Sequence, residues 1–181
     1  MEQKKIRIVG VAGSLRKNSY NAAVLRAARE FLPEHVKMET VEIGDLPFFN
    51  EDVESAGLPA SVVAFKAKLA SADALLIATP EYNYGIPPVL KNAIDWASRG
   101  ESALYGKPVG IVSASPSMLG GARAQYQLRQ ICVSVNLLPI NKPEVFIAAA
   151  YDKFDETGRL TDPMARDFLS KLVAELIKTV R

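Results

Sequence analysis

The sequence predicts a three-layer α/β fold, in which helices cover both faces of a doubly wound parallel sheet of five strands in the order 2-1-3-4-5. Three observations predict it. Strand-like and helical patterns alternate along all 181 residues. The central strand-like run is apolar on both faces. No linker or internal repeat divides the chain, so residues 1–181 are expected to form one domain.

The expected strands are short runs rich in apolar and β-branched residues. They cover residues 6–12, 38–43, 74–78, 109–112 and 144–148. The third run, Ala-Leu-Leu-Ile-Ala, contains no polar side chain, which is typical of a parallel strand buried between two layers of helices.

Helices are expected between the strands because apolar residues recur there at helical spacing. Their apolar positions are Val24, Leu25, Ala28, Phe31 and Leu32; Val62, Phe65, Leu69 and Ala72; Leu90, Ala93, Ile94 and Ala97 within residues 88–98; Leu128, Ile131, Cys132 and Val135; and Phe168, Leu169, Leu172, Val173, Leu176, Ile177 and Val180. The last helix is expected to begin at Asp162-Pro163, a capping residue followed by proline. Five strand–helix units favour the flavodoxin-like strand order over a six-stranded dinucleotide-binding sheet.

Composition excludes several classes of site. Cys132 is the only cysteine and His35 the only histidine, so an intramolecular disulfide and a Cys/His zinc site are excluded. The formal net charge of +2 argues against a broad surface for nucleic acid. No apolar run approaches the roughly 20 residues of a transmembrane helix, and residues 1–13 do not resemble a secretion signal. We therefore expect a cytoplasmic protein that binds neither nucleic acid nor membrane.

A ligand site is expected where the strand order reverses, beyond the carboxyl ends of the first, third and fourth strands. The loop at residues 13–19 offers hydroxyl, amide and guanidinium groups just before a helix, which are the parts of a phosphate cradle. The loop at residues 79–87 combines prolines with two tyrosines, and a rigid loop with free N–H groups suits a flat heteroaromatic ring. The loop at residues 113–121 is small and polar.

Each loop also has an ordinary structural interpretation. The first can be a helix cap beside solvated charges, the second a turn whose tyrosines cover the end of the sheet, and the third a flexible Ser/Gly connection. Two standard phosphate motifs are absent. Gly10 and Gly13 do not complete G-x-G-x-x-G. Five residues separate Gly100 from Gly106, and Pro108 stands where a Walker A loop needs Ser or Thr, so hydrolysis of nucleoside triphosphates is not expected.

Taken together, the loops resemble those of the NAD(P)H-dependent FMN reductase family of flavodoxin-like proteins, and within it the chromate/quinone reductase branch. The resemblance lies in residues 13–21, 79–84, 88–96 and 120–123, in the family's order. It implies that these residues contact FMN: Ser14, Leu15, Arg16, Asn18, Ser19, Tyr20, Asn21, Pro80, Glu81, Tyr82, Asn83, Tyr84, Gly85, Ser113, Ser115, Ser117 and Gly120.

The resemblance assigns a part to each loop. Ser14, Arg16, Ser19 and Asn21 would hold the phosphate, residues 80–84 would line the isoalloxazine, and residues 113–117 would flank its other side. The matching helix residues Lys91, Asn92 and Asp95 are interpreted as structural, at a subunit contact. Members of the family are homodimers or dimers of dimers (homotetramers), so a partner subunit is expected to close part of the flavin site.

The resemblance also implies the chemistry. Bound FMN would take a hydride at N5 from the nicotinamide C4 of NADPH or NADH and then reduce an acceptor in a ping-pong order. The acceptors implied are quinones, azo compounds, flavins, and chromate and other metal oxyanions. No side-chain nucleophile is then required, so Cys132 is expected in the core and His35 in a solvated loop at the opposite edge of the sheet.

Two alternatives remain open. The acidic residues Glu51, Asp52, Glu54, Asp152, Asp155 and Glu156 could form a Mg²⁺ site, although solvated loops are the expectation. The whole chain could instead be a non-enzymatic, flavodoxin-like electron carrier or FMN-binding module. Carriers commonly dock through a strongly charged face, and 22 basic against 20 acidic residues provide none in bulk.

Overall fold

The sheet has the predicted order and direction. The computed structural model describes residues 4–180, with strands β1 (Ile6–Ala12), β2 (Val36–Val41), β3 (Ala74–Thr79), β4 (Pro108–Ala114), β5 (Leu138–Pro139) and β6 (Val145–Ile147). All pairs are parallel, and the order is β2-β1-β3-β4-β5, with β6 also paired to β4. The described residues leave out Arg181 and Met1–Gln3. Met1–Gln3 is the start of the segment that is expected not to be a secretion signal.

The prediction of five strands was wrong in one detail, because the fifth position holds two segments. β5 pairs with the start of β4, at Pro108 and Val109, whereas β6 pairs with its end. Beyond β5 the N–H of Ile140 still donates to the Val109 carbonyl at 2.9 Å, but the Ile140 carbonyl accepts from the Arg129 guanidinium at 3.1 Å, and the chain rejoins β4 only at Val145. The predicted strand at residues 144–148 corresponds to β6, and β5 was not predicted.

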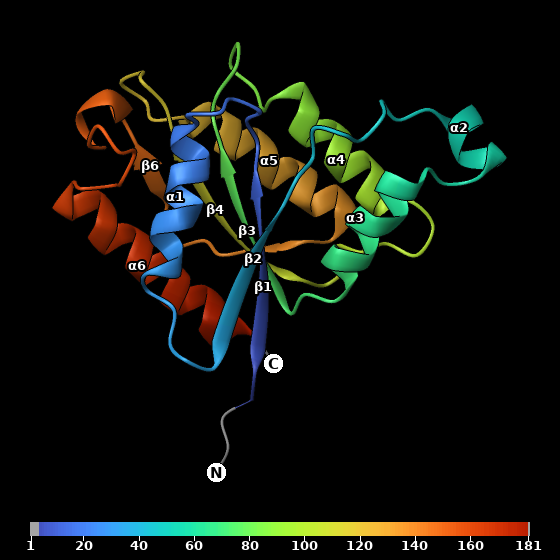
Figure 1. Ribbon diagram of the computed structural model, residues 1–181, viewed down its shortest axis with the longest axis horizontal. Helices are drawn as coiled ribbons and strands as arrows, with labels where there is room; N and C mark the ends of the chain where they lie inside the picture. The colour runs from blue at the N-terminus through green and yellow to red at the C-terminus, as the bar shows by residue number, and fades with distance from the viewer. Residues whose placement is uncertain (1–3, 181) are drawn as a thin grey trace.

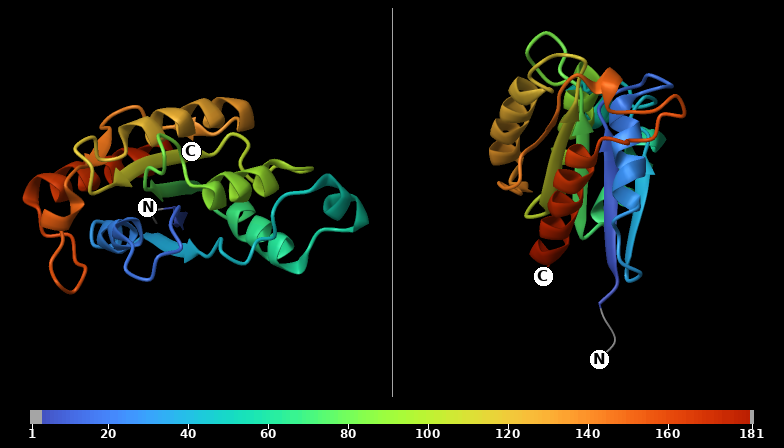
Figure 2. Two further views of the ribbon diagram at one scale, coloured as in Figure 1. Left: turned by 90° about the horizontal axis from the view of Figure 1, so that it is seen from above. Right: turned by 90° about the vertical axis from the view of Figure 1, so that its left-hand side faces the viewer.

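Helices cover both faces of the sheet, as the three-layer prediction requires. They are α1 (Tyr20–Arg29), α2 (Glu51–Ala56), α3 (Ala60–Ala70), α4 (Pro88–Ser98), α5 (Ala122–Val135) and α6 (Pro163–Thr179), with a 3-10 turn at Ala150–Asp152. Figures 1 and 2 show α1 and α6 on one face and α3, α4 and α5 on the other. Among residues 4–180, no helix is both long and apolar enough to cross a membrane.

The short helix α2 was not predicted, because residues 45–58 carry no apolar stripe. Its residues are all at least partly exposed, and it projects from one end of the molecule (Figure 1). The side chain of Asn50 caps it by accepting a hydrogen bond from the N–H of Asp52 at 2.8 Å. The cap acts together with Val53, which packs against the core, and with Glu54, which pairs with Arg99 at 2.8 Å.

Two hydrophobic clusters fill the spaces between the layers. Val9 and Val11 of β1 point toward α3 and α4, where Phe65 and the fully buried Trp96 pack. The alternate side chains of the same strand belong to the cluster formed with α1 and α6. Because successive side chains of a strand point to opposite faces, each central strand contributes to both cores at once.

The last helix begins where the sequence predicted. An oxygen of Asp162 accepts a hydrogen bond from the N–H of Ala165 at 2.8 Å, and the other oxygen pairs with Lys153 at 2.8 Å. The hydrogen bond from Lys153, followed by that from the Ala165 N–H, holds the pKa of Asp162 below its usual value.

We expect Asp162→Ala to lower the free energy of unfolding by about 1 kcal/mol at pH 7, as for other capping residues. Because the folded pKa is depressed, this contribution is complete above the unfolded pKa, about 3.9, and is lost as the pH falls through the folded value. Urea unfolding at several pH values checks this. If the difference in the free energy of unfolding between wild type and variant stayed constant between pH 7 and pH 3, it would contradict the assignment of Asp162 as an ionised cap.

Candidate functional site

The loops predicted to form the site lie at one edge of the sheet. The segments that follow β1, β3 and β4 emerge together at the top of Figure 1. The first is fastened to the second because the N–H of Gly13 donates to the carbonyl of Ala78 at 2.8 Å. A Cβ on Gly13 would lie 3.1 Å from both Leu90 and Thr79, so glycine permits this close approach.

The loop after β1 presents a free cationic and polar surface. Leu15, Arg16, Lys17 and Asn18 are all exposed. No side-chain hydrogen bond of Arg16 or Asn18 to another described residue is present, and the N–H groups of Tyr20 and Asn21 in the first turn of α1 likewise lack an acceptor in residues 4–180. A helix start with unpaired N–H groups beside a free guanidinium can bind a phosphate.

Other residues at this helix start are already engaged by the protein. Ser19 caps α1, its hydroxyl accepting from the N–H of Ala22 at 3.3 Å. The side chain of Asn21, 2% exposed, donates to the carbonyl of Ala114 at 2.9 Å and accepts from its N–H at 3.0 Å. It clamps α1 to the end of β4. A direct contact between the Asn21 side chain and phosphate stays a prediction that these bonds do not favour.

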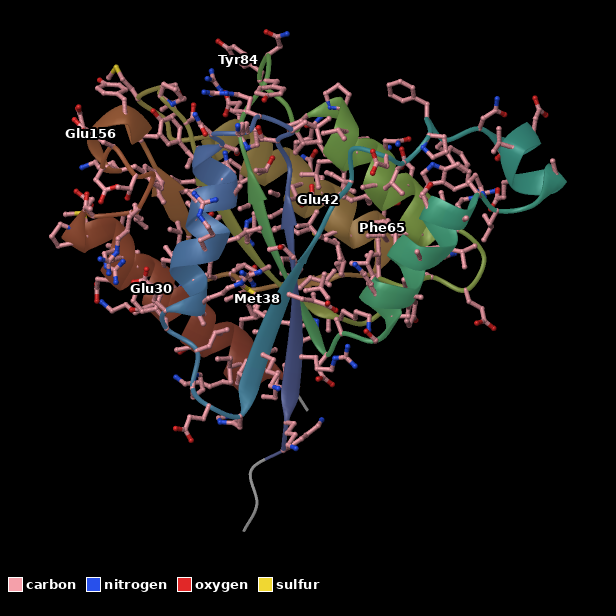
Figure 3. All side chains as sticks on the ribbon, in the orientation of Figure 1. Glu30, Met38, Glu42, Phe65, Tyr84 and Glu156 are labelled. Atoms are coloured by element: carbon pink, nitrogen blue, oxygen red, sulfur yellow. The ribbon has the colours of Figure 1, made fainter. Side chains whose placement is uncertain are left out.

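The loop after β3 closes in a tight turn. Tyr82 and Gly85 exchange two backbone hydrogen bonds of 2.9 and 3.0 Å, which leaves Asn83 and Tyr84 between them at φ of 48° and 71°. Positive φ at two consecutive residues is strained for residues with side chains. Figure 3 shows Tyr84 at the outer tip of the loop, and the guanidinium of Arg123 lies 3.6 Å from the centre of its ring.

Glu81 fastens the same loop to α5. The cap position of α5 is Gly121, which has no side chain, and the Glu81 carboxylate takes its place. It accepts from the N–H groups of Arg123 and Ala124 at 3.1 and 3.3 Å, and it pairs with the Arg123 guanidinium at 2.6 Å. This carboxylate is therefore compensated before any ligand binds. Its contact with FMN stays a prediction, and any such contact has to be made around these bonds.

The loop after β4 divides into a buried floor and an exposed rim. Ser113 is fully buried, donates to the carbonyl of Gly120 and accepts from Gln125 at 2.9 Å. Gly120 is also buried, and a Cβ there would meet the backbone that follows β6 at 2.8 Å. The hydroxyls of Ser115 and Ser117 are linked at 3.1 Å, and Ser117 is exposed. Ser117 therefore lies at the exposed rim, whereas Ser115 is buried and, like Ser113 and Gly120, supports the loop; the contacts of these residues with FMN stay predictions.

Two hollows adjoin these loops. One, of about 560 Å³, is lined by Gly13, Leu15, Arg16, Gly44, Leu46, Phe48, Tyr82, Pro87, Pro88, Val89 and Asn92. The other, of about 420 Å³, runs between α1 and the end of β2 and carries Arg16, Lys17, Arg26 and Arg29 against Glu42. A larger hollow of about 730 Å³ lies around His35 at the amino ends of β1 and β2. We place the site at the carboxyl edge, where the loops with unpaired donors converge.

His35 and Cys132 lie apart from this edge. His35 is half-buried and immediately precedes β2, at the amino end of the sheet. Cys132 is fully buried in the core, and burial raises the pKa of its thiol to about 11. Both placements agree with the prediction that neither is a nucleophile at the carboxyl edge. Within residues 4–180, no group of three or more His, Cys, Asp or Glu side chains could hold a metal ion.

The raised pKa makes Cys132 unreactive. At pH 8 we expect the native protein to react with a thiol-specific disulfide reagent at least about 100-fold more slowly than the unfolded chain, because the thiolate fraction falls by roughly 200-fold and access is blocked. Absorbance of the released thiol, with and without denaturant, measures both rates. Native labelling as fast as denatured labelling would show that Cys132 is not buried as described.

Sequence reasoning missed the contacts that support these loops. Arg123 was noted only as part of a motif, and Gln125 was not noted at all. Asn92 and Trp96 were assigned to a structural helix, without a partner. They fix the segment after β2 by hydrogen bonds to the Pro47 carbonyl of 2.9 and 2.7 Å. A polar residue on an otherwise apolar helical stripe was the available signal for Asn92.

Comparisons with known proteins agree with the geometry. The family model for NADPH-dependent FMN reductase matches residues 6–152. An NAD(P)H-dependent FMN reductase of Pseudomonas aeruginosa is 47% identical over 177 residues, which is 97% of this chain and 96% of that protein. A quinone reductase of Escherichia coli K12 is 41% identical over 171 residues, or 92% of this chain and 91% of that protein.

A solved structure extends the similarity to three dimensions. The flavoenzyme NAD(P)H:(acceptor) oxidoreductase FerB of Paracoccus denitrificans superposes with a TM-score of 0.88 at 32% identity and covers 97% of both chains. The matched segment runs from β1 past β6, and so includes all three loops of the candidate site. On this evidence of sequence, fold and site, the chain belongs to the NADPH-dependent FMN reductase family.

Proposed function

We propose that this protein is an FMN-dependent NAD(P)H oxidoreductase that reduces quinones. The observation that carries the proposal is the convergence, at the switch point of the sheet, of a helix start and an Arg16 side chain that lack partners among residues 4–180 with a rigid aromatic loop. The similarity to FMN reductases and quinone reductases over more than nine-tenths of their lengths supports it.

The residues present fit FMN. No carboxylate lies in residues 13–21, and the only acidic side chain of the second loop, Glu81, is neutralised by Arg123. A dianionic phosphate bound against residues 13–21 would meet the hydroxyl of Ser14, the guanidinium of Arg16, the amide of Asn18 and the N–H groups of Tyr20 and Asn21. The cradle is cationic where the ligand is anionic.

The second and third loops would hold the flavin ring. The turn formed by Tyr82 and Gly85 gives a rigid edge, and the exposed Ser117 offers a hydroxyl on the side of β4, supported from beneath by the buried Ser115. Bound FMN supplies hydride chemistry between NAD(P)H and an acceptor, in a ping-pong order. The chain itself binds and orients the reactants, and no side-chain nucleophile is needed.

Anaerobic mixing with NADPH or NADH tests the proposal. The visible absorbance of the flavin should bleach after mixing and should return when a quinone is added. Failure of NAD(P)H to bleach the flavin, with intact FMN binding, would favour the non-enzymatic electron carrier. A protein that does not take up FMN would overturn both functions. Steady-state lines that intersect, when NADPH and quinone are both varied, would overturn the ping-pong order.

Several finer features belong to the same proposal. We infer one catalytic domain per chain, a cytoplasmic location, and activity toward azo compounds, free flavins, and chromate and other metal oxyanions as well as quinones. We also infer a homodimer or homotetramer whose partner subunit completes the flavin site. Sedimentation of the FMN-loaded protein and turnover assays with each acceptor class test these inferences separately.

A further inference from the structure

We propose that the hollow of about 560 Å³ between the loops after β1, β2 and β3 binds the ring of a flat, apolar electron acceptor. In it, Phe48 is the specificity-determining wall, and Asn92 is a positioning residue that holds Phe48 in place. The proposal rests on the proposed function and names the class of acceptor that the site prefers.

The location of the hollow separates it from the flavin cradle while keeping it adjacent. It shares Leu15, Arg16 and Tyr82 with the loops proposed to hold FMN. None of its lining residues comes from the loop after β4; instead, Phe48 and Leu46 come from the loop after β2. A ligand here would lie beside the flavin site on the side of β2. Its volume falls within the range of small-molecule pockets.

The walls favour an apolar ring over a charged acceptor. Leucine, valine, phenylalanine, tyrosine and proline side chains line most of the hollow, and the prolines, Pro87 and Pro88, contribute no N–H groups. Arg16 is its only charged residue. A quinone has apolar faces for these walls, whereas a hydrophilic metal complex gains little from them, and Arg16 is the group proposed above to bind the FMN phosphate.

Phe48 is exposed on a rigid segment. Its side chain is 80% exposed, although both neighbouring residues are fixed. The Pro47 carbonyl accepts hydrogen bonds from Asn92 at 2.9 Å and from the Trp96 indole at 2.7 Å. The N–H of Phe49 donates to Asn92 at 2.7 Å. The backbone that carries the ring is therefore held on both sides, so binding has only the side chain of Phe48 left to restrict.

A direct binding measurement tests the assignment. Trp96 is the only tryptophan and lies behind the segment that carries Phe48, so its fluorescence can report an occupant. Oxidised holoenzyme without NAD(P)H is titrated with a naphthoquinone. We expect saturable quenching, with a dissociation constant raised roughly 5- to 15-fold by Phe48→Ala, because alanine removes the apolar wall. Tyr105→Ala, which removes a ring 73% exposed elsewhere, serves as the matched control and should bind like wild type.

Kinetics test selectivity and positioning. The ratio of kcat/KM for the naphthoquinone to that for ferricyanide should fall by the same factor in Phe48→Ala, through KM rather than kcat. Asn92→Ala should also lower this ratio. Phe48→Tyr, which keeps an aromatic ring at the position, should show the wild-type ratio. If Asn92→Ala does not fold, Phe48→Ala and Phe48→Tyr still decide the matter.

A failure of the acceptor pocket can be distinguished from a failure of the proposed function. An unchanged dissociation constant and an unchanged ratio in Phe48→Ala would overturn the acceptor pocket. So would a Phe48→Ala variant that loses FMN but retains the wild-type KM for naphthoquinone at saturating FMN, because Phe48 would then serve the flavin site. Absence of NAD(P)H–quinone turnover in the wild type would overturn the proposed function instead, while the fluorescence titration would still report on Phe48.

Discussion

Replacing Arg16 by alanine is expected to weaken FMN binding about 10- to 150-fold. The guanidinium is exposed beside the unpaired first turn of α1 and has no side-chain partner in the described part of the chain. A hydrogen bond to a charged phosphate contributes roughly 1.5 to 3 kcal/mol, which gives that range of affinities. The helix start alone contributes less, about 0.3 to 1 kcal/mol, so the weakening should be seen even with α1 intact.

Flavin fluorescence titration of flavin-free protein measures the effect, and Lys17→Ala provides the control. Lys17 is the adjacent exposed cation and lines the groove on the far side of the loop rather than the hollow next to Tyr82. Its removal changes the net charge equally, but it should weaken FMN by less than about 3-fold if direct contact, not general attraction, is responsible. Equal effects in the two variants, or none in Arg16→Ala, would remove Arg16 from the phosphate site.

The fold was predictable where a repeating pattern fixes the structure. The alternation of apolar strands and amphipathic helices indicated the layers, and the switch point located the loops. Elements that depend on a few contacts with distant residues were not predictable. β5 is two residues long and pairs with Pro108 and Val109, and α2 combines the cap at Asn50 with a core contact of Val53 and an ion pair of Glu54. Neither leaves a periodic signal in the sequence.

The candidate site was likewise predictable only in part. Residue types predicted which loops carry the chemistry, but they could not predict which side chains the protein itself uses. Glu81 and Ser113 look like ligand-binding residues in the sequence, yet one caps α5 and the other is buried beneath Gly120. The α5 groups that Glu81 binds lie 42 and 43 residues further along the chain, and only folding brings them together. The hydrogen bonds between Asn92 and the segment after β2 were hidden for the same reason.

Asn21→Ala is expected to lower the free energy of unfolding by about 2 to 5 kcal/mol. The change leaves the N–H and the carbonyl of Ala114 without partners at a buried site, and each unpaired group costs roughly 1 to 3 kcal/mol. Urea unfolding of flavin-free protein measures the decrease. Asn18→Ala is the matched control: this exposed asparagine of the same loop makes no hydrogen bond to the described chain, so its removal should change stability by less than about 0.5 kcal/mol.

Repeating the unfolding experiment over a range of FMN concentrations separates the two roles that Asn21 could have. A ligand stabilises the folded state by an amount that grows with its concentration relative to the dissociation constant. If Asn21 is a clamp between α1 and β4, Asn21→Ala has a lower free energy of unfolding than wild type even without FMN, and this deficit grows little as FMN is added. If its amide binds the phosphate instead, the deficit is near zero without FMN and rises, at saturation, to the free energy of the missing amide–phosphate hydrogen bond. The second pattern would contradict the clamp and return Asn21 to the phosphate site that the sequence predicted.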